Sequence, residues 1–295
     1  MTLATHGDFA SLGPATLDWS ERFRLRSDTI GQDFLIEVAW PPVRPAPGQR
    51  FPVVYVLDGN HAFALAAMTA RAIQGGPFPL PPTLVVGIGY CFEKPEHHAQ
   101  WGALRLRDLT PGPDALLESQ SPGASARCGG AGVFLEFIET QVKPFIASRF
   151  PVDPDDQTLV GGSLSGLFAL HTLFTRPSAF DRYVAISPAI YWGDRMLFDL
   201  EAELAATVTD LPAHLFLGAG SLEEGHDARQ GFVSNLSAME ARLLARRYPS
   251  LDLTSRVFEG ETHMSVYAGA VTRGLGAVFG GYNDLSDWSR WLART

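Results

Sequence analysis

Ser163 has the sequence surroundings of a nucleophile. It lies in the stretch LVGGSLSGLFAL, residues 159–170, where one apolar run ends and a second, helix-like run begins. A serine in a sharp turn from strand to helix needs small residues two positions away on each side, because the strand and the helix approach closely there. Gly161 and Ser165 meet this need. The stretch therefore predicts a serine that attacks an electrophilic carbon.

The same stretch allows three other interpretations. A turn of small residues without chemistry is the simplest. If Ser165 were the nucleophile, the bulky Leu167 would occupy a position that requires close packing. A phosphate-binding loop would need a lysine after the glycines, and none follows. We therefore keep Ser163 as the candidate.

A serine hydroxyl at neutral pH needs a histidine to accept its proton and a carboxylate to orient that histidine. His263 lies in a polar loop before the last predicted helix, where such a base belongs if the order is serine, acid, histidine. The preceding predicted strand is followed by SLEEGHD, residues 221–227. We choose Glu223 as the acid because it is the first carboxylate after the strand. Glu224 and Asp227 are the alternatives.

Attack on a carbonyl also requires two hydrogen-bond donors for the developing oxyanion. One is the backbone N–H of Leu164, the residue after the nucleophile. The other is expected in the loop after the third strand, where VLDGNHAF, residues 56–63, contains a tight turn. We choose the N–H of Asn60 for this second role.

The elements that would carry these residues alternate along the chain. Apolar or alternating runs predict strands at 22–27, 33–41, 51–59, 83–90, 158–162, 182–187, 214–220 and 253–260. Segments with a 3.6-residue period predict helices at 61–73, 131–150, 164–176, 233–248 and 264–279. Strand followed by helix, repeated, predicts an α/β fold with a mostly parallel sheet covered by helices on both faces.

We interpret residues 1–295 as one domain with a polar leader at 1–20. For residues 91–130 we predict a long irregular connection. We expect it to form a cap or wall over a pocket, because connections of this length are usually functional.

Composition narrows the class of partner. The chain has 295 residues, 46% hydrophobic and 19% charged, with a formal net charge of −9 and no dense Lys/Arg cluster. This balance argues against nucleic acid and membrane surfaces and favours a small-molecule substrate. Cys91 and Cys128 are too few for a disulfide framework, and His97 and His98 lack the spacing of a metal site. We expect no cofactor, no metal and a cytoplasmic protein; the oligomeric state stays open.

Several stretches together resemble a known group: the branch of the α/β-hydrolases that includes esterase D-like enzymes and the trilactone esterases that open enterobactin and salmochelin. The resemblance covers residues 20–280 in order. It runs through FPVVYVLDGNHAF, LVVGIGY, RLRDLTP, GGSLSGLFALHTLFTRP, AISPAIYW, LGAGSLEEG and GETHMSVYAGAVTRGL. It departs from the group at Ser165, where a glycine is commoner.

The resemblance implies an α/β-hydrolase fold without a large inserted cap, and a serine esterase with Ser163 as nucleophile and His263 as base. It implies that Arg105 faces an anionic or phenolic group of the substrate, with a surface ion pair to Asp108 as the alternative. Trp101, Trp192 and Tyr191 are candidates for stacking on aromatic rings. In some siderophore esterases the third triad member is weakened or absent, so the resemblance also leaves open a Ser163–His263 dyad without Glu223.

The sequence supports four hypotheses about function. The first is hydrolysis of a carboxylic ester or lactone through an acyl-serine, with a catecholate siderophore trilactone as the most specific substrate that the resemblance implies. A short-chain or aryl carboxylesterase and an acyltransferase use the same chemistry on other substrates. A binding protein that keeps the fold without turnover is the alternative from another class.

Overall fold

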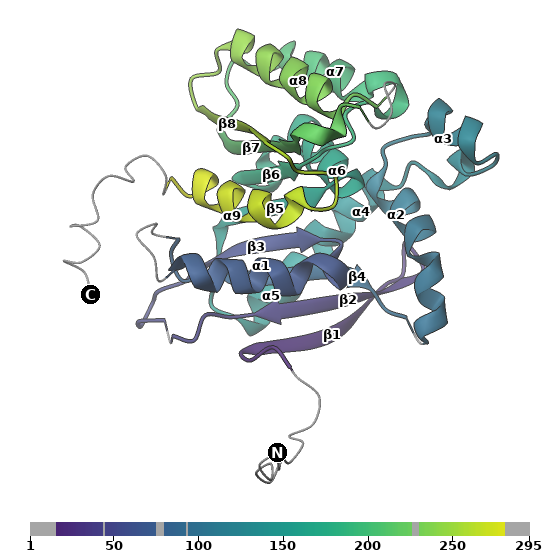
Figure 1. Cartoon of the computed structure of the whole chain (residues 1–295). Helices are drawn as coiled ribbons and strands as arrows, with labels where there is room; N and C mark the ends of the chain where they lie inside the picture. Colours follow the sequence, from purple (N-terminus) through teal and green to yellow (C-terminus); the bar gives the residue numbers. More distant parts are fainter. Residues whose placement is uncertain (1–15, 44, 75–79, 93, 226–229, 281–295) are drawn as a thin grey trace, which may run out of the picture.

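A single mixed sheet organises the molecule (Figure 1). The computed structural model describes residues 16–43, 45–74, 80–92, 94–225 and 230–280. Within them, eight strands pair in the order β1-β2-β4-β3-β5-β6-β7-β8. β1 and β2 are antiparallel to their neighbours, and the pairs from β4 to β8 are parallel. The strands are β1 (Ser20–Ser27), β2 (Gln32–Ala39), β3 (Phe51–Leu57), β4 (Leu84–Tyr90), β5 (Val152–Gly162), β6 (Arg182–Ile186), β7 (Ala213–Gly220) and β8 (Leu251–Phe258).

Helices cover both faces of this sheet, which confirms the predicted α/β architecture. α1 (Gly59–Gln74) and α9 (Val266–Val278) lie in front of the sheet in Figure 1. The opposite face carries α4 (Ala131–Phe137), the π-helical turn η3 (Ile138–Val142), α5 (Lys143–Arg149), α6 (Leu164–Thr175), α7 (Trp192–Ala205) and α8 (Phe232–Arg246).

Strand periodicity explains why there are two cores. Along β3, Val54 and Val56 pack with the apolar residues of α1 and α9, whereas Val53, Tyr55 and Leu57 belong to the core on the other face. Successive side chains of a strand point to opposite faces, so a strand buried on both sides is apolar throughout. This is why β3 and β4 were recognisable in the sequence as continuous apolar runs.

Residues 91–130 differ from the prediction, because much of this segment is helical. It contains η1 (Pro95–Gln100), α2 (Trp101–Leu109), α3 (Ala115–Gln120) and η2 (Ser125–Arg127). The Asp114 carboxylate caps α3 by accepting from the Leu117 N–H at 2.7 Å. These helices are short and interrupted by glycine and proline, so they lack the long apolar period that identified the others. α2 forms a wall of the cavity described below.

The parallel arrangement places the carboxyl ends of β3, β5, β6, β7 and β8 at one edge of the sheet, where ligands bind in folds of this kind. The loops that follow these strands carry Asp58, Ser163, Ser187, Glu223 and His263. In the described part of the chain, no helix has the length and apolar character needed to cross a membrane.

Candidate active site

Ser163 sits in a strained turn between β5 and α6. Its φ is 58° and its ψ is −117°, a conformation that side-chain-bearing residues rarely adopt. The Ser163 N–H donates to the Ile186 carbonyl at 2.9 Å, and the Ser163 carbonyl accepts from the Leu167 N–H at 2.9 Å. A Cβ at Gly161 would lie 2.1 Å from the Ser165 carbonyl oxygen, so only glycine fits there. The turn is therefore fixed by backbone bonds on both sides and by the glycine that allows it.

Ser165 occupies the second small position and is fully buried. Its Oγ accepts from the Gly162 N–H at 2.8 Å and lies 2.7 Å from Asp58 Oδ2, to which it donates. The Ser165 hydroxyl is thus engaged in hydrogen bonds in the protein interior, whereas Ser163 lines the cavity. The geometry favours Ser163 over Ser165 as the reactive serine.

Buried Glu223 and half-buried His263 form a pair across the loops after β7 and β8. His263 Nδ1 and Glu223 Oε2 are 2.6 Å apart, and Glu223 is only 2% exposed. Glu223 Oε1 accepts from the Ser187 hydroxyl and from the Gly220 N–H, each at 2.6 Å. Burial alone would raise the pKa of Glu223, but the hydrogen bonds from His263, Ser187 and Gly220 together outweigh it and hold the pKa below its ordinary value. The carboxylate therefore stays ionised beside the imidazole.

The other candidate acids differ from Glu223. Glu224 is exposed, and its Oε2 accepts from the Ser234 N–H at 2.8 Å at the start of α8. Asp227 lies outside the described residues, as do residues 1–15 of the predicted leader. Of the carboxylates that the structure describes in this loop, Glu223 is the one bonded to His263.

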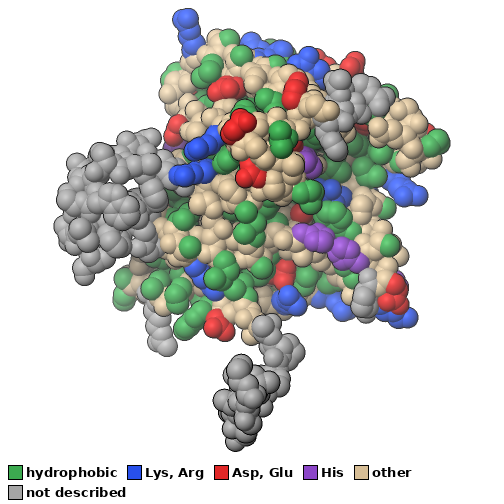
Figure 2. Space-filling model, viewed as in Figure 1, with side chains coloured by type: hydrophobic (Ala, Val, Ile, Leu, Met, Phe, Trp, Pro, Cys, Tyr) green, Lys and Arg blue, Asp and Glu red, His purple; other side chains and the backbone are tan. Residues whose placement is uncertain are grey.

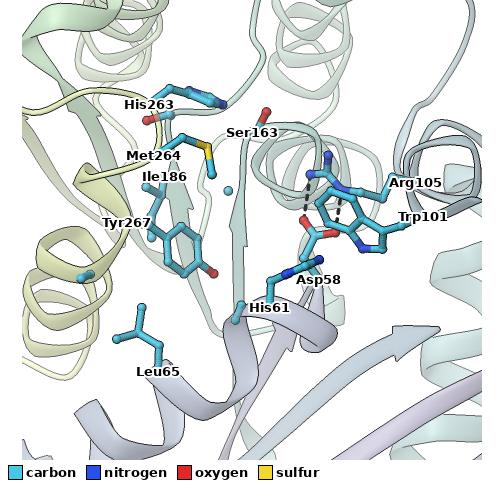
Figure 3. Close-up of a pocket in the computed structure, with 14 residues that line it drawn as sticks. Asp58, His61, Leu65, Trp101, Arg105, Ser163, Ile186, His263, Met264 and Tyr267 are labelled. Atoms are coloured by element: carbon cyan, nitrogen blue, oxygen red, sulfur yellow. Dashed lines mark hydrogen bonds and ion pairs between the residues drawn. The ribbon is translucent and has the colours of Figure 1, made fainter. Parts of the chain in front are cut away.

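The serine and the histidine meet at the mouth of the site. Figure 3 shows the His263 ring extending toward the Ser163 hydroxyl. Both residues line the same two cavities. Within the described residues no hydrogen bond joins the Ser163 hydroxyl to His263; such contacts are often long in enzymes without substrate and tighten when it binds.

The two expected oxyanion donors lie in different settings. Leu164 is the first residue of α6, so its N–H has no hydrogen-bond acceptor within the helix. Asn60 lies in the first turn of α1, and its side chain is tied to β4: Nδ2 donates to the Tyr90 carbonyl at 2.9 Å and Oδ1 accepts from the Tyr90 N–H at 2.7 Å. Neither Asn60 nor Leu164 is among the residues lining the two cavities, so the oxyanion roles of their backbone N–H groups stay predictions.

A cavity of about 470 Å³ opens beside Ser163, and we call it the Arg105 cavity. Arg105 in α2 forms a bidentate pair with Asp58, with Nε–Oδ1 at 2.6 Å and Nη2–Oδ2 at 2.8 Å (Figure 3). Their side chains are 13% and 12% exposed. The alternative pairing with Asp108 is wrong, because Asp108 bonds Arg107 instead. Arg105 is therefore a largely buried charge at the cavity wall.

Aromatic rings form the rest of this wall. The Arg105 guanidinium lies over the Trp101 ring at 4.4 Å from its centroid, and the His61 ring meets Trp101 edge to face at 4.6 Å. His61 also contacts His98, with ring centroids 5.0 Å apart. Figure 2 shows histidine side chains reaching the surface beside α1 and α2. Trp101 thus lines the cavity beside Ser163, and its stacking on a substrate ring stays a prediction.

The other two predicted rings are placed differently. Trp192 is 3% exposed, and its indole N–H donates to the Gly112 carbonyl at 2.9 Å. It lines neither cavity at Ser163, so its assignment to substrate binding is corrected to a packing role. Tyr191 lines a second cavity of about 530 Å³, which also contacts Ser163 and His263; we call it the Tyr191 cavity.

Several site residues were not predicted. They are Asp58, His61, Ser187 and Tyr267 in the Arg105 cavity, Leu222, Gln230 and Phe232 in the Tyr191 cavity, and Met264 in both. A signal was available for two of them: Asp58 directly follows β3 and Ser187 directly follows β6, at the same edge as Ser163. For the others, the lining role depends on contacts between distant segments.

Comparisons with known proteins decide the family. Residues 120–242 match the family described as "Putative esterase". The chain is 33% identical over 289 residues to the siderophore triacetylfusarinine C esterase of Aspergillus fumigatus, covering 90% of this chain and 95% of that protein. It is also 33% identical over 241 residues to the ferri-bacillibactin esterase BesA of Bacillus subtilis, covering 79% and 81% of the two chains. This chain belongs to that esterase family.

The fold agrees with this assignment. The siderophore hydrolase EstA of Aspergillus nidulans superposes on the esterase with a TM-score of 0.79 at 28% identity, covering 92% of this chain and 97% of that one. The predicted α/β-hydrolase fold and the predicted ester hydrolase activity are confirmed at the level of the family.

Proposed function

We propose that this esterase cleaves a carboxylic ester or lactone through an acyl-serine intermediate, with Ser163 as nucleophile, His263 as base and Glu223 as the orienting acid. The observation that carries the proposal is the Glu223–His263 bond. Because Nδ1 of His263 is held by Glu223, Nε2 is the nitrogen left to exchange a proton with Ser163. The ionised carboxylate also stabilises the imidazolium that forms.

The reaction proceeds in two halves. His263 Nε2 takes the proton of Ser163 as Oγ bonds to the carbonyl carbon, and the oxyanion is held by the N–H groups of Leu164 and Asn60. The carbon–oxygen bond to the alcohol then breaks, and Nε2 protonates the departing oxygen. A water molecule repeats the sequence: it loses a proton to Nε2, attacks the acyl carbon and releases the acid with return of the proton to Ser163.

We propose a siderophore ester as the substrate class. The two relatives at 33% identity act, by their names, on triacetylfusarinine C and ferri-bacillibactin. The site suits a large substrate with groups on both sides of the cleaved bond, because the Arg105 and Tyr191 cavities meet at Ser163. Asp58 takes up Nε and Nη2 of Arg105, so we propose that the remaining N–H groups of Arg105 donate to a phenolic or anionic oxygen of the substrate and that the Trp101 ring stacks on its aromatic group.

We place the enzyme in the cytoplasm, where hydrolysis would release iron after import of a ferric complex. Both described cysteines, Cys91 and Cys128, are free thiols, which is usual in a reducing compartment.

Labelling tests the mechanism directly. The protein is incubated with a fluorophosphonate, its intact mass is measured and the modified peptide is mapped. We expect one adduct, on Ser163, and no adduct on Ser163→Ala. Folded protein that stays unlabelled would support the binding-protein alternative, and an adduct on Ser165 would require a different oxyanion hole.

Kinetics then test the substrate class. Ser163→Ala should lower kcat by on the order of 10⁶, as for comparable triads. Siderophore esters, simple alkyl esters and aryl esters are compared by kcat/KM, with and without an added alcohol acceptor. A clear preference for simple esters would favour the carboxylesterase, and capture of the acyl group by the alcohol would favour the acyltransferase.

A further inference from the structure

A short segment after β6 contacts both the nucleophile turn and the acid strand. Ile186, the last residue of β6, accepts from the Ser163 N–H at 2.9 Å, and in the segment that follows, the Ala189 N–H donates to the Ser163 carbonyl at 3.2 Å. On the other side, the Ser187 N–H donates to the Gly218 carbonyl in β7 at 2.6 Å. The segment therefore joins the backbone of the nucleophile to the strand that leads to the acid.

Ser187 adds a side-chain contact to this connection. It is 2% exposed and has a φ of 41°, in the left-handed region that residues other than glycine rarely adopt. Its hydroxyl donates to Glu223 Oε1 at 2.6 Å. The same oxygen accepts from the Gly220 N–H, while Oε2 faces His263 Nδ1. The two oxygens of one carboxylate are thus divided between Ser187 and His263.

We propose that Ser187 is a positioning residue of the hydrolytic site, which fixes the Glu223 carboxylate so that one oxygen is presented to His263 in register with Ser163. The proposal rests on the proposed function, because it assigns Ser187 a part in holding the acid of that reaction. Strained backbone at a cavity-lining position is consistent with this role, because such strain persists where the surrounding structure over-determines the conformation.

Removing the hydroxyl should loosen the acid. In Ser187→Ala, Oε1 keeps only the Gly220 N–H, and rotation about the Glu223 side chain would move Oε2 away from His263. Small misplacements of catalytic groups cost up to about 100-fold in rate. We expect kcat to fall about tenfold to 100-fold with little change in KM, because Ser187 holds the acid and not the substrate.

The position of the carboxylate gives the proposal a second readout. Glu223 Oε2, held 2.6 Å from His263 Nδ1, stabilises the imidazolium form of His263. When the carboxylate turns away in Ser187→Ala, this stabilisation weakens. The acidic limb of the kcat/KM profile should therefore move to lower pH. The charged group bonded to His263 in the described residues is Glu223, and Phe232 packs on its ring at 4.8 Å.

The experiment compares two variants of the full chain. Ser187→Ala removes the hydroxyl and keeps the strained backbone, whereas Ser187→Gly removes the hydroxyl and relieves the strain. For each we would measure kcat, KM, the pH dependence of kcat/KM and the rate of fluorophosphonate labelling. Equal losses and equal shifts of the acidic limb in both variants are expected. Wild-type pH profiles and labelling rates in both would overturn the proposal.

Ser221→Ala is the matched control. Ser221 lies two residues before Glu223, and its hydroxyl accepts from the Gly260 N–H at 2.9 Å without touching the carboxylate. Ser221→Ala should leave the acidic limb of the kcat/KM profile in place. A shift as large as that of the Ser187 variants would show that any change in this loop loosens it, and would contradict a specific positioning role for Ser187. A wild-type protein that neither hydrolyses esters nor reacts with the fluorophosphonate would refute the proposed function instead.

Discussion

Glu223 and Glu224 are neighbours in sequence, but the fold gives their carboxylates different surroundings. Glu223 is buried and bonded to His263, whereas Glu224 is exposed and bonded to the start of α8. Glu223→Gln keeps the size and removes the charge that orients the imidazole. We expect it to lower kcat by about 10⁴-fold, as when the acid of a serine triad is lost.

Glu224→Gln is the control for this change. It removes the same charge one residue away and should leave kcat/KM within about a factor of two, as surface substitutions usually do. Equal, mild losses in both variants would argue that Ser163 and His263 act as a dyad or that Asp227 is the acid.

At the scale of single residues, the sequence was informative where a residue type suited to catalysis directly follows a predicted strand. Ser163, His263 and Glu223 each follow a predicted strand, and parallel topology brings such positions together. Asp58 was not predicted to pair with Arg105, because the loop after β3 and α2 meet only in the folded chain. Trp192 was assigned to substrate binding from its ring alone, and its burial depends on packing that no local pattern reveals.

The turn between β5 and α6 is the element on which the proposed reaction depends, and Gly161 is its tightest point. A methyl group there would lie 2.1 Å from the Ser165 carbonyl oxygen, which is backbone and cannot rotate away. Gly161→Ala should lower the free energy of unfolding by about 3 kcal/mol and abolish labelling of Ser163. Urea unfolding and the fluorophosphonate reaction measure the two effects.

Gly132→Ala in α4 is the matched substitution. A Cβ at Gly132 meets nothing within 4 Å, so it should stabilise the helix by about 0.5 to 1 kcal/mol and leave labelling unchanged. If Gly161→Ala were as stable and as reactive as this variant, the steric account of the turn would be wrong.

Among the elements, strands were easier to predict than short helices. Strands β3, β4, β6 and β7 and the second half of β5 are largely buried and apolar, and their runs stand out in the sequence. The helices α2 and α3 were missed because each is short and lies among glycines and prolines. The helix α7 was missed as well. It contains residues Gly193, Asp194 and Arg195 in left-handed conformations, which break the helical pattern near its start.

At the scale of the whole molecule, the sheet order explains why two cavities adjoin the proposed reaction centre. Loops after β3 and β5, with α1 and α2, form most of the Arg105 cavity, and loops after β6, β7 and β8 form the Tyr191 cavity. Ser163, His263 and Met264 belong to both. A scissile ester at Ser163 would therefore have its acyl part on one side and its alcohol part on the other.

This arrangement predicts how substrate size affects rate. Four esters that combine a small or large acyl part with a small or large alcohol part would be compared by kcat/KM. Each enlargement should raise kcat/KM by about tenfold to 100-fold, because burying an apolar arm contributes roughly 1 to 3 kcal/mol, and the two gains should multiply. Leu65→Ala in the Arg105 cavity and Leu222→Ala in the Tyr191 cavity form a matched pair. Each should reduce the gain from one arm only, and the pairing identifies which cavity holds the acyl part. A loss of rate on enlarging either arm would instead indicate an enzyme for small esters.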